Sequence, residues 1–324
     1  MLGFDILGKK YKENEKPMAE LIRKIEPADI PQVEELIAMT RAGAVIADIK
    51  RLGGMTNHSY KVTLKGGEEL LVRIPGDGTE EMINRLDERK STQLACDLHI
   101  DSDLYYFGGD GKKVMRFIHD PQEMNEAVMR RPENLKQAAE LFHRLHYSGV
   151  DTGVRFEVFE MAALYEKIIR DGGVAFYDDY EAVKQAVMAI KAEVDKGGEA
   201  PKVPCHNDSL MGNWVLDGEG RLYLIDWEYS GMNEPMWDLS CLSIEADYSP
   251  AEDDLLLDTY YGYEGRAAGV EEKKRFIAAK MYVDFLWTLW GLTRIPFDGQ
   301  FMQEYADNRY VRLKKNIEAY KRLG

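Results

Sequence analysis

Three polar residues within one short stretch have the types and the spacing that phosphoryl transfer requires. Asp208 is followed five residues later by Asn213, and Asp226 comes directly after the apolar run 222–225. The glycines and charges of 217–221 predict a hairpin turn, which would bring Asp226 back beside Asn213 with Asp208 facing both. Mg²⁺ prefers hard oxygen ligands, and a further carboxylate beside them can orient a hydroxyl and accept its proton. We therefore expect Asn213 and Asp226 to bind Mg²⁺ and Asp208 to act as the catalytic base.

Each of these residues alone has an ordinary explanation, because an Asp near an Asn usually caps a turn. The ordered set, with an apolar strand before the last Asp, is typical of a kinase catalytic loop. Protein kinases carry His-Arg-Asp and Asp-Phe-Gly at these places, whereas this chain has His206-Asn207-Asp208 and, at 226–228, Asp-Trp-Glu. Together with Asn213 and Tyr229, these motifs resemble the choline/ethanolamine kinase family, within the group of aminoglycoside phosphotransferase-like kinases. The departure favours a small-molecule kinase over a protein kinase.

The resemblance extends from about residue 52 to residue 305 and carries expectations for the whole chain. It implies an α+β, bilobal protein-kinase-like fold with an N-terminal antiparallel sheet plus a helix and a mostly helical C-terminal lobe. Residues 1–118 would form the nucleotide-binding lobe, and residues 119–324 the catalytic and substrate-binding lobe. The resemblance also implies ATP and Mg²⁺ as cofactors.

The composition fits a globular enzyme. A chain of 324 residues, 45% of them hydrophobic, leaves room for two domains and a substantial core. Three widely spaced cysteines fit free thiols in a reducing compartment, and no signal-peptide pattern is present, so we expect a cytoplasmic protein. No apolar run has the length of a membrane span. The net charge of −15 disfavours nucleic acid and anionic membranes as partners, and it suits a cationic substrate, although an acidic surface is more often a solubility feature. The sequence does not reveal the oligomeric state.

The periodicity of apolar residues predicts the elements that must position these groups. Helical spacing predicts helices, and short β-like runs divided by glycine pairs predict strands. The expected strands cover 45–52, 59–64, 70–74, 104–107 and 113–118. The expected helices cover 27–39, 80–98, 133–147, 158–170, 179–194, 251–261, 271–292 and 300–320.

The segment between the first two strands is a candidate phosphate-binding loop. Glycine lets the chain bend so that backbone N–H groups approach phosphate oxygens, although a Gly pair between strands is usually only a turn. The sequence Gly-Gly-Met-Thr-Asn-His at 53–58 resembles the family's loop, which implies nucleotide contacts from Thr56, Asn57 and His58. Arg73, after the third apolar run, takes the place of the kinase lysine, and its planar fork suits phosphate. A solvent-facing arginine on an edge strand is the alternative.

The resemblance assigns two further parts of the nucleotide site. Residues 84–88 resemble the family's Arg-x-x-Glu helix, so Glu88 would pair with Arg73; Asp87 and Glu81 are the alternatives. The end of the last strand would be the hinge, where adenine hydrogen-bonds to backbone groups. The hinge residues are Met115, Arg116, Phe117 and Ile118.

For two histidines and one further aspartate we expect a structural role. His143 and His146 stand three apart on a helix, which is a metal-binding spacing, but no Glu-x-x-His set accompanies them, so we favour packing or hydrogen bonding. Asp238 resembles the family's structural Asp, which braces the catalytic loop through hydrogen bonds. The alternative for Asp238 is an acid at a helix N-terminus.

Trp287 and Trp290 stand three apart, so their indoles share one face of a helix. Core packing between helices is one explanation. A quaternary ammonium, however, cannot donate hydrogen bonds and needs dry aromatic faces, of which Trp is the best. The spacing resembles the Trp-x-x-Trp of the choline pocket in choline kinases, and the resemblance adds Tyr229 and Tyr305. Leu210 stands where the family often has Gln, so a polar contact that bears on selectivity is lost.

These observations predict transfer of the γ-phosphoryl group of ATP to the hydroxyl of choline, which Asp208 would contact, giving phosphocholine and ADP. Ethanolamine, another small alcohol or an aminoglycoside is the nearer alternative. Ethanolamine is a primary ammonium and would gain more from carboxylates than from indoles. A kinase-like binding protein that has lost turnover is the alternative from a different class.

Overall fold

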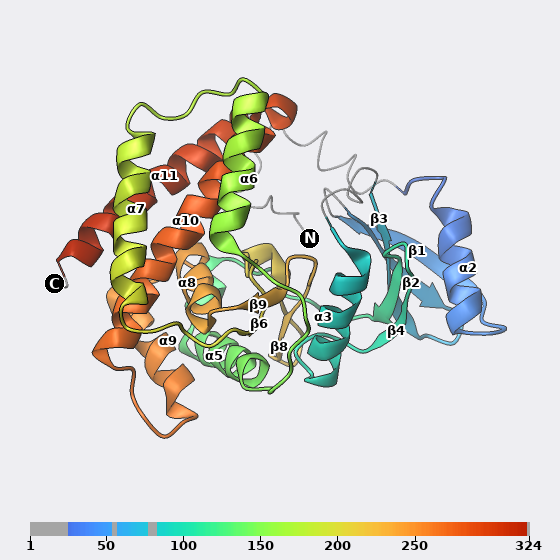
Figure 1. The fold of residues 1–324 in the computed structure, drawn as a ribbon. Helices are drawn as coiled ribbons and strands as arrows, with labels where there is room; N and C mark the ends of the chain where they lie inside the picture. Colours follow the sequence, from blue (N-terminus) through green and yellow to red (C-terminus); the bar gives the residue numbers. More distant parts are fainter. Residues whose placement is uncertain (1–24, 54–56, 77–82, 323–324) are drawn as a thin grey trace.

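The computed structural model describes residues 25–53, 57–76 and 83–322. Within these ranges the N-terminal part of the chain forms an antiparallel sheet, and the rest is mostly helical, as the sequence predicted (Figure 1). The strand order in the sheet is β1-β2-β3-β5-β4. The strands are β1 (Ile46–Gly53), β2 (Asn57–Leu64), β3 (Glu69–Pro75), β4 (Leu104–Phe107) and β5 (Lys113–Arg116).

One face of this sheet is covered by helix α2 (Ile30–Thr40), and the other face is directed toward the site. On β3, Leu70 and Val72 are buried in a cluster with residues of α2. Successive side chains of a strand point to opposite faces. Leu71 and Arg73 therefore face away from α2, and both line a cavity on that side. The alternation of β3 thus places Arg73 at the site and not in solvent.

Helix α3 (Arg85–Asp97) lies between the sheet and the helical part of the molecule (Figure 1). It begins later than the predicted residue 80, at least within the described residues. Asn84 is its N-cap, and the Asn84 side chain accepts a hydrogen bond from the backbone N–H of Leu86 at 3.1 Å. Helical spacing could not reveal this start, because the cap and not the apolar pattern determines it.

Apart from the short helix α4 and one helix described below, neither of which was predicted, the helices after residue 118 lie close to the predicted spans, although α10 continues to Asp298 beyond the predicted residue 292. The longest two, α10 and α11, pack against each other along their lengths, and α6 and α7 lie beside them (Figure 1). Their bounds are α4 (Glu126–Met129), α5 (Pro132–His146), α6 (Val158–Asp171), α7 (Tyr180–Asp195), α9 (Pro250–Gly262), α10 (Val270–Asp298) and α11 (Gln300–Lys321).

Helix α8 (Pro235–Glu245) was not predicted. Every residue from Met236 to Ile244 is buried, so the helix has no exposed face to alternate with a buried one. Periodicity depends on such a contrast, and a helix surrounded by protein lacks it. α8 therefore shows no amphipathic pattern although it packs against α10 and carries Asp238.

Two further findings concern the whole of the described chain. All three cysteines are buried and unpaired, which confirms the expectation of free thiols. In the ranges that the structure describes, no helix contains a stretch both long enough and apolar enough to span a bilayer.

Candidate active site

A short hairpin brings the catalytic-loop residues and Asp226 together, as predicted. Strand β7 (Trp214–Leu216) pairs with β8 (Leu222–Leu224), with Trp214 opposite Leu224. One residue beyond this register, the Ile225 N–H donates to the backbone oxygen of Asn213 at 2.8 Å. Asp226 therefore leaves the hairpin beside Asn213.

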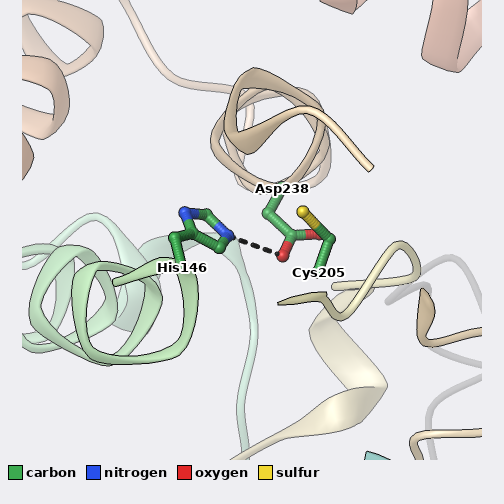
Figure 2. A group of neighbouring side chains, drawn as sticks. All are labelled: His146, Cys205 and Asp238. Atoms are coloured by element: carbon green, nitrogen blue, oxygen red, sulfur yellow. Dashed lines mark hydrogen bonds and ion pairs between the residues drawn. The ribbon is translucent and has the colours of Figure 1, made fainter. Parts of the chain in front are cut away.

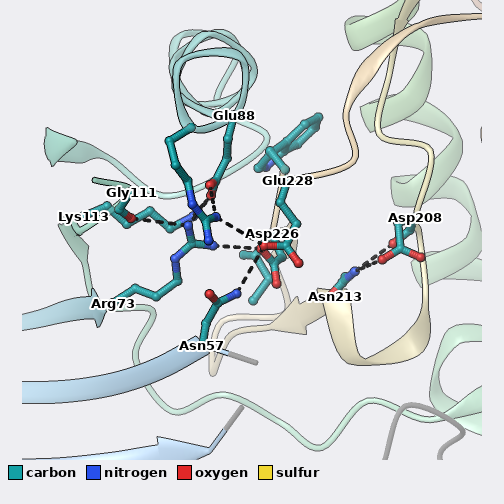
Figure 3. A network of polar contacts seen from close by, with 12 residues as sticks. Asn57, Arg73, Glu88, Gly111, Lys113, Asp208, Asn213, Asp226 and Glu228 are labelled. Atoms are coloured by element: carbon teal, nitrogen blue, oxygen red, sulfur yellow. Dashed lines mark hydrogen bonds and ion pairs between the residues drawn. The ribbon is translucent and has the colours of Figure 1, made fainter. Parts of the chain in front are cut away.

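Asn213 connects this hairpin to Asp208 (Figure 3). Its side-chain nitrogen donates to the Asp208 backbone oxygen at 2.7 Å and lies 3.4 Å from Asp208 Oδ2. Because the amide nitrogen of Asn213 is turned toward Asp208, its amide oxygen is directed away from Asp208. That oxygen is the atom that would ligate a hard cation.

The loop around these residues has strained backbone that hydrogen bonds hold in place. Asn207 and Asp226 have φ values of +69° and +67°, a region that non-glycine residues seldom occupy. The Asn207 side chain donates to the Tyr229 backbone oxygen at 3.0 Å, which ties the two segments together. Asp238 accepts from the backbone N–H groups of His206 at 2.7 Å and Asn207 at 2.8 Å. The predicted bracing by Asp238 is confirmed, and Asp238 also lies in the first turn of α8.

Asp238 also belongs to a buried group with His146 and Cys205 (Figure 2), whose potential ligand atoms lie within 4.8 Å of one another. His146 Nε2 lies 3.1 Å from Asp238 Oδ2, and His146 Nδ1 lies 2.8 Å from the Tyr260 hydroxyl. Both ring nitrogens of His146 therefore have protein partners. Binding a metal here would break these bonds, so we assign the group a bracing role. The predicted hydrogen-bonding role of His146 is confirmed.

On the other side of Asp226 lies a network of buried charges (Figure 3). Arg73 donates to Asp226 Oδ1 at 3.0 Å and forms a short ion pair with Glu88. The predicted pairing of Arg73 with Glu88 is thus confirmed. Arg85 binds the other oxygen of Glu88 at 2.7 Å, and Lys113 lies 3.6 Å from Glu88. A buried carboxylate surrounded by three cations fixes the guanidinium of Arg73 beside Asp226.

Three acidic side chains, those of Asp208, Asp226 and Glu228, lie around the predicted metal site. Burial and the charge of Asp226 raise the pKa of Asp208 to about 8. Burial and the charge of Asp226 also raise the pKa of Glu228 above its usual range. A divalent cation beside these carboxylates would relieve their repulsion. The oxygen donors of Asn213 and Asp226 therefore fit Mg²⁺, and Glu228 is a further carboxylate at this place whose role the sequence alone did not indicate.

A cavity lies between the sheet and the β7–β8 hairpin. Arg73 and Asp226 line it, and so do the four predicted hinge residues 115–118. Sequence reasoning missed several other residues of the wall, because apolar strand residues and short loops have no distinctive pattern. These are Leu52, Ser59, Leu71, Asp101, Ser102, Lys113, Pro121, Val215 and Ile225.

The predicted phosphate loop falls partly outside the described residues, and Thr56 with it. Asn57 donates from its side chain to Glu228 Oε2 at 3.3 Å, so it reaches the charged network. His58 does not reach that network, because its Nδ1 lies 2.6 Å from Asp29 Oδ2, next to α2. Neighbouring residues of a strand face opposite ways, and β2 turns Asn57 and Ser59 toward the site and His58 away from it.

The four predicted cage residues lie in a continuous row of edge-to-face rings. Ring centroids are 5.7 Å apart for Tyr229 and Trp287, 5.9 Å for Trp287 and Trp290, and 5.7 Å for Trp290 and Tyr305. Trp287 and Tyr305 are buried, whereas Tyr229 and Trp290 are half-buried. Part of the row therefore packs in the core, which was the alternative explanation for the Trp pair.

The two phenols at the ends of the row interact electrostatically with Asp208. Burial raises the pKa of Tyr229, and the charge of Asp208 raises it further. Burial likewise raises the pKa of Tyr305, and Asp208 adds to that shift as well. Two phenols at the two ends of the row thus both lie within the field of the Asp208 carboxylate.

Comparison with known proteins identifies the family. The model of the choline/ethanolamine kinase family matches residues 49–285. The chain belongs to the choline/ethanolamine kinase family. Its fold is the protein-kinase-like fold, which solved structures of this family and of other phosphotransferases share. As a member of this kinase family, it is an enzyme that phosphorylates a small alcohol.

Solved structures of family members resemble most of the chain. A choline/ethanolamine kinase family protein from Mesorhizobium loti is 31% identical, with a TM-score of 0.77, over 91% of this chain and 97% of that one. The choline kinase LicA from Streptococcus pneumoniae is 28% identical, with a TM-score of 0.75, over 90% of this chain and all of its own. A LicA structure in complex with AMP is 27% identical, with a TM-score of 0.72, over 91% of this chain and 100% of that chain.

Proposed function

We propose that this family member transfers the γ-phosphoryl group of ATP to the hydroxyl of choline, giving phosphocholine and ADP. The observation that carries the proposal is that Asp208, which contacts the Asn213 amide, also adds to the effect of burial in raising the pKa values of Tyr229 and Tyr305 at the two ends of the row of aromatic rings. A choline whose trimethylammonium group lies against the rings would direct its hydroxyl to Asp208. The choline kinase activity named for the S. pneumoniae LicA relative supports this choice of acceptor.

In this reaction Asp208 and its neighbours would have distinct roles. Asp208 orients the hydroxyl and accepts its proton while the hydroxyl oxygen bonds to the γ-phosphorus and the bond to ADP breaks. Asn213 and Asp226 would hold Mg²⁺, which when bound would neutralise charge on the phosphate oxygens. Positioning and charge neutralisation account for most of the barrier reduction in phosphoryl transfer, so a rigidly braced loop suits the task.

The nucleotide would occupy the cavity between the sheet and the hairpin. We assign residues 1–118 to a nucleotide-binding lobe and 119–324 to a catalytic lobe. Arg73, held by Glu88, would bind phosphate, and residues 115–118 would bind adenine through their backbone. Thr56 and Asn57 would contact phosphate. For His58 the contact with Asp29 argues against a direct nucleotide contact.

One assay tests the function and its alternatives. Purified protein with ATP and Mg²⁺ should release ADP fastest with choline in a panel that also contains ethanolamine, other small alcohols and aminoglycosides. A higher kcat/KM for another acceptor would assign the enzyme to that acceptor. Absence of ADP release with every acceptor would favour a kinase-like binding protein without turnover.

The Asp208→Asn variant tests the assignment of the base. Loss of the proton acceptor should lower kcat by roughly a hundredfold or more, while the affinity for ATP measured by calorimetry stays nearly unchanged. Asp151→Asn is a matched control, because Asp151 is exposed and its ion pair is with Arg155. Near-normal kcat in Asp208→Asn would show that another group accepts the proton.

A further inference from the structure

A buried ion pair lies beneath the aromatic row. Arg309 of α11 is 3% exposed, and its Nη2 lies 2.6 Å from Oε1 of Glu245, the last residue of α8. The Arg309 guanidinium carbon is 4.7 Å from the centre of the Tyr305 ring. Arg309 therefore contacts a predicted cage ring and a carboxylate at the same time.

The charge of Glu245 acts on residues at both ends of the acceptor site. Burial raises the pKa of Tyr305, and the charges of Glu245 and Asp208 raise it further, while Arg309 lowers it. The charge of Glu245 also raises the pKa of Asp208, whereas the charge of Arg309 lowers it. Without Arg309, the Glu245 carboxylate would be an unpaired acceptor beside the row of rings.

Whether the Glu245 carboxylate is free to accept a hydrogen bond affects which cation the site accepts. A primary ammonium has three N–H donors, and each donor that is buried without an acceptor costs free energy. A trimethylammonium group has no donor and loses nothing among aromatic rings. In the proposed reaction Asp208 binds the hydroxyl of the acceptor, and Oε1 of Glu245 is paired with Arg309. The rings then offer a primary ammonium little to replace its water.

We propose that Arg309 is a specificity-determining residue: by holding Glu245 in an ion pair, it makes the site select quaternary over primary ammonium acceptors. The inference rests on the proposed function, since it concerns the acceptor site of that reaction.

The structure supplies a matched control in the same cluster. Arg309 Nη1 lies 3.3 Å from Asp284 Oδ1, but Arg312 also binds Asp284, with Nε at 2.8 Å and Nη2 at 2.7 Å. If Arg309 is removed, Asp284 keeps Arg312 and only Glu245 loses its ion-pair partner. If Arg312 is removed, Glu245 keeps Arg309.

The test compares Arg309→Met with Arg312→Met, using choline and ethanolamine as acceptors at saturating ATP and Mg²⁺. Methionine fills much of the volume of the arginine stem without a charge. In Arg309→Met, the ratio of kcat/KM for choline to that for ethanolamine should fall about tenfold or more, the worth of a hydrogen bond to a charged group. In Arg312→Met the ratio should be unchanged. An unchanged ratio in Arg309→Met, or an equal fall in both variants, would overturn the proposal.

Glu245→Gln supplies a second test that does not depend on the folding of Arg309→Met. Because the carboxylate of Glu245 is already engaged, neutralising it should leave the choline-to-ethanolamine ratio unchanged. A selective loss with ethanolamine would show that Glu245 already accepts from the ammonium, against the proposal. In the double variant Arg309→Met/Glu245→Gln, the gain with ethanolamine should disappear. Wild-type protein that phosphorylates neither acceptor would overturn the proposed function, whereas unaltered ratios in an active enzyme overturn only the role of Arg309.

Discussion

At the scale of single residues, Asp208 and Asp226 carry the same group in different surroundings. Asp226 shares a hydrogen bond with Arg73, while the pKa of Asp208 is raised to about 8 by burial and by Asp226. When two neighbouring carboxylates have such different environments, one of them often binds a charge and the other transfers a proton. This difference supports giving the metal to Asp226 and the proton to Asp208.

Trp290 is the residue that best tests the acceptor site, because it is half-buried between Trp287 and Tyr305. Trp290→Ala should raise the KM for choline on the order of tenfold, since it removes a cation–π face. The KM for ATP should not change.

Phe297→Ala is the control for Trp290→Ala. Phe297 is on the same helix, but it is 75% exposed and should not affect either KM. Equal changes in the two KM values of Trp290→Ala would indicate general loss of structure and not loss of an acceptor contact.

At the scale of elements, the contact between α10 and α11 positions the cage. Gly291 follows Trp290 on α10, and the ring of Tyr305 on α11 packs directly against it. A Cβ at position 291 would lie 2.9 Å from Tyr305 Cδ1 and 3.2 Å from the Cβ of Ala306. The absence of a side chain at Gly291 thus lets the two helices bring Tyr305 and Trp290 together.

Gly291→Ala should therefore separate the helices and weaken choline binding. Overpacking of this kind costs about 1–3 kcal/mol, so both Tm and choline affinity should fall, the latter by several-fold. In Gly262→Ala, where no atom lies within 4 Å of the added Cβ, Tm should stay the same or rise. A Gly291→Ala protein with wild-type choline KM would show that the helix spacing does not control the cage.

At the scale of the whole molecule, the net charge of −15 should assist capture of a cation. At saturating ATP and Mg²⁺, kcat/KM for choline should fall several-fold as NaCl shortens the screening length to below about 8 Å. The uncharged isostere 3,3-dimethylbutan-1-ol is the control, and its kcat/KM should not depend on salt. A parallel decline for both acceptors would assign the salt effect to the enzyme and not to steering.

The sequence predicted most elements and the groups that lie close in sequence, and missed what depends on packing. The hairpin and the Trp pair follow from short motifs and periodicity, and the Arg73–Glu88 pair follows from the resemblance to the family. Helix α8 was not predicted because it is buried on all sides and has no amphipathic pattern. The orientation of His58 and the Arg309–Glu245 pair depend on contacts 29 and 64 residues apart, which no local pattern reveals.

The central claim is that the γ-phosphoryl group of ATP reaches the hydroxyl of choline. ³¹P NMR of the protein with ATP, Mg²⁺ and choline tests it directly, because it distinguishes phosphocholine from inorganic phosphate. We predict that phosphocholine and ADP accumulate in equal amounts and that both vanish when choline or Mg²⁺ is omitted. Unchanged ATP, or ADP accompanied only by inorganic phosphate, would contradict the account.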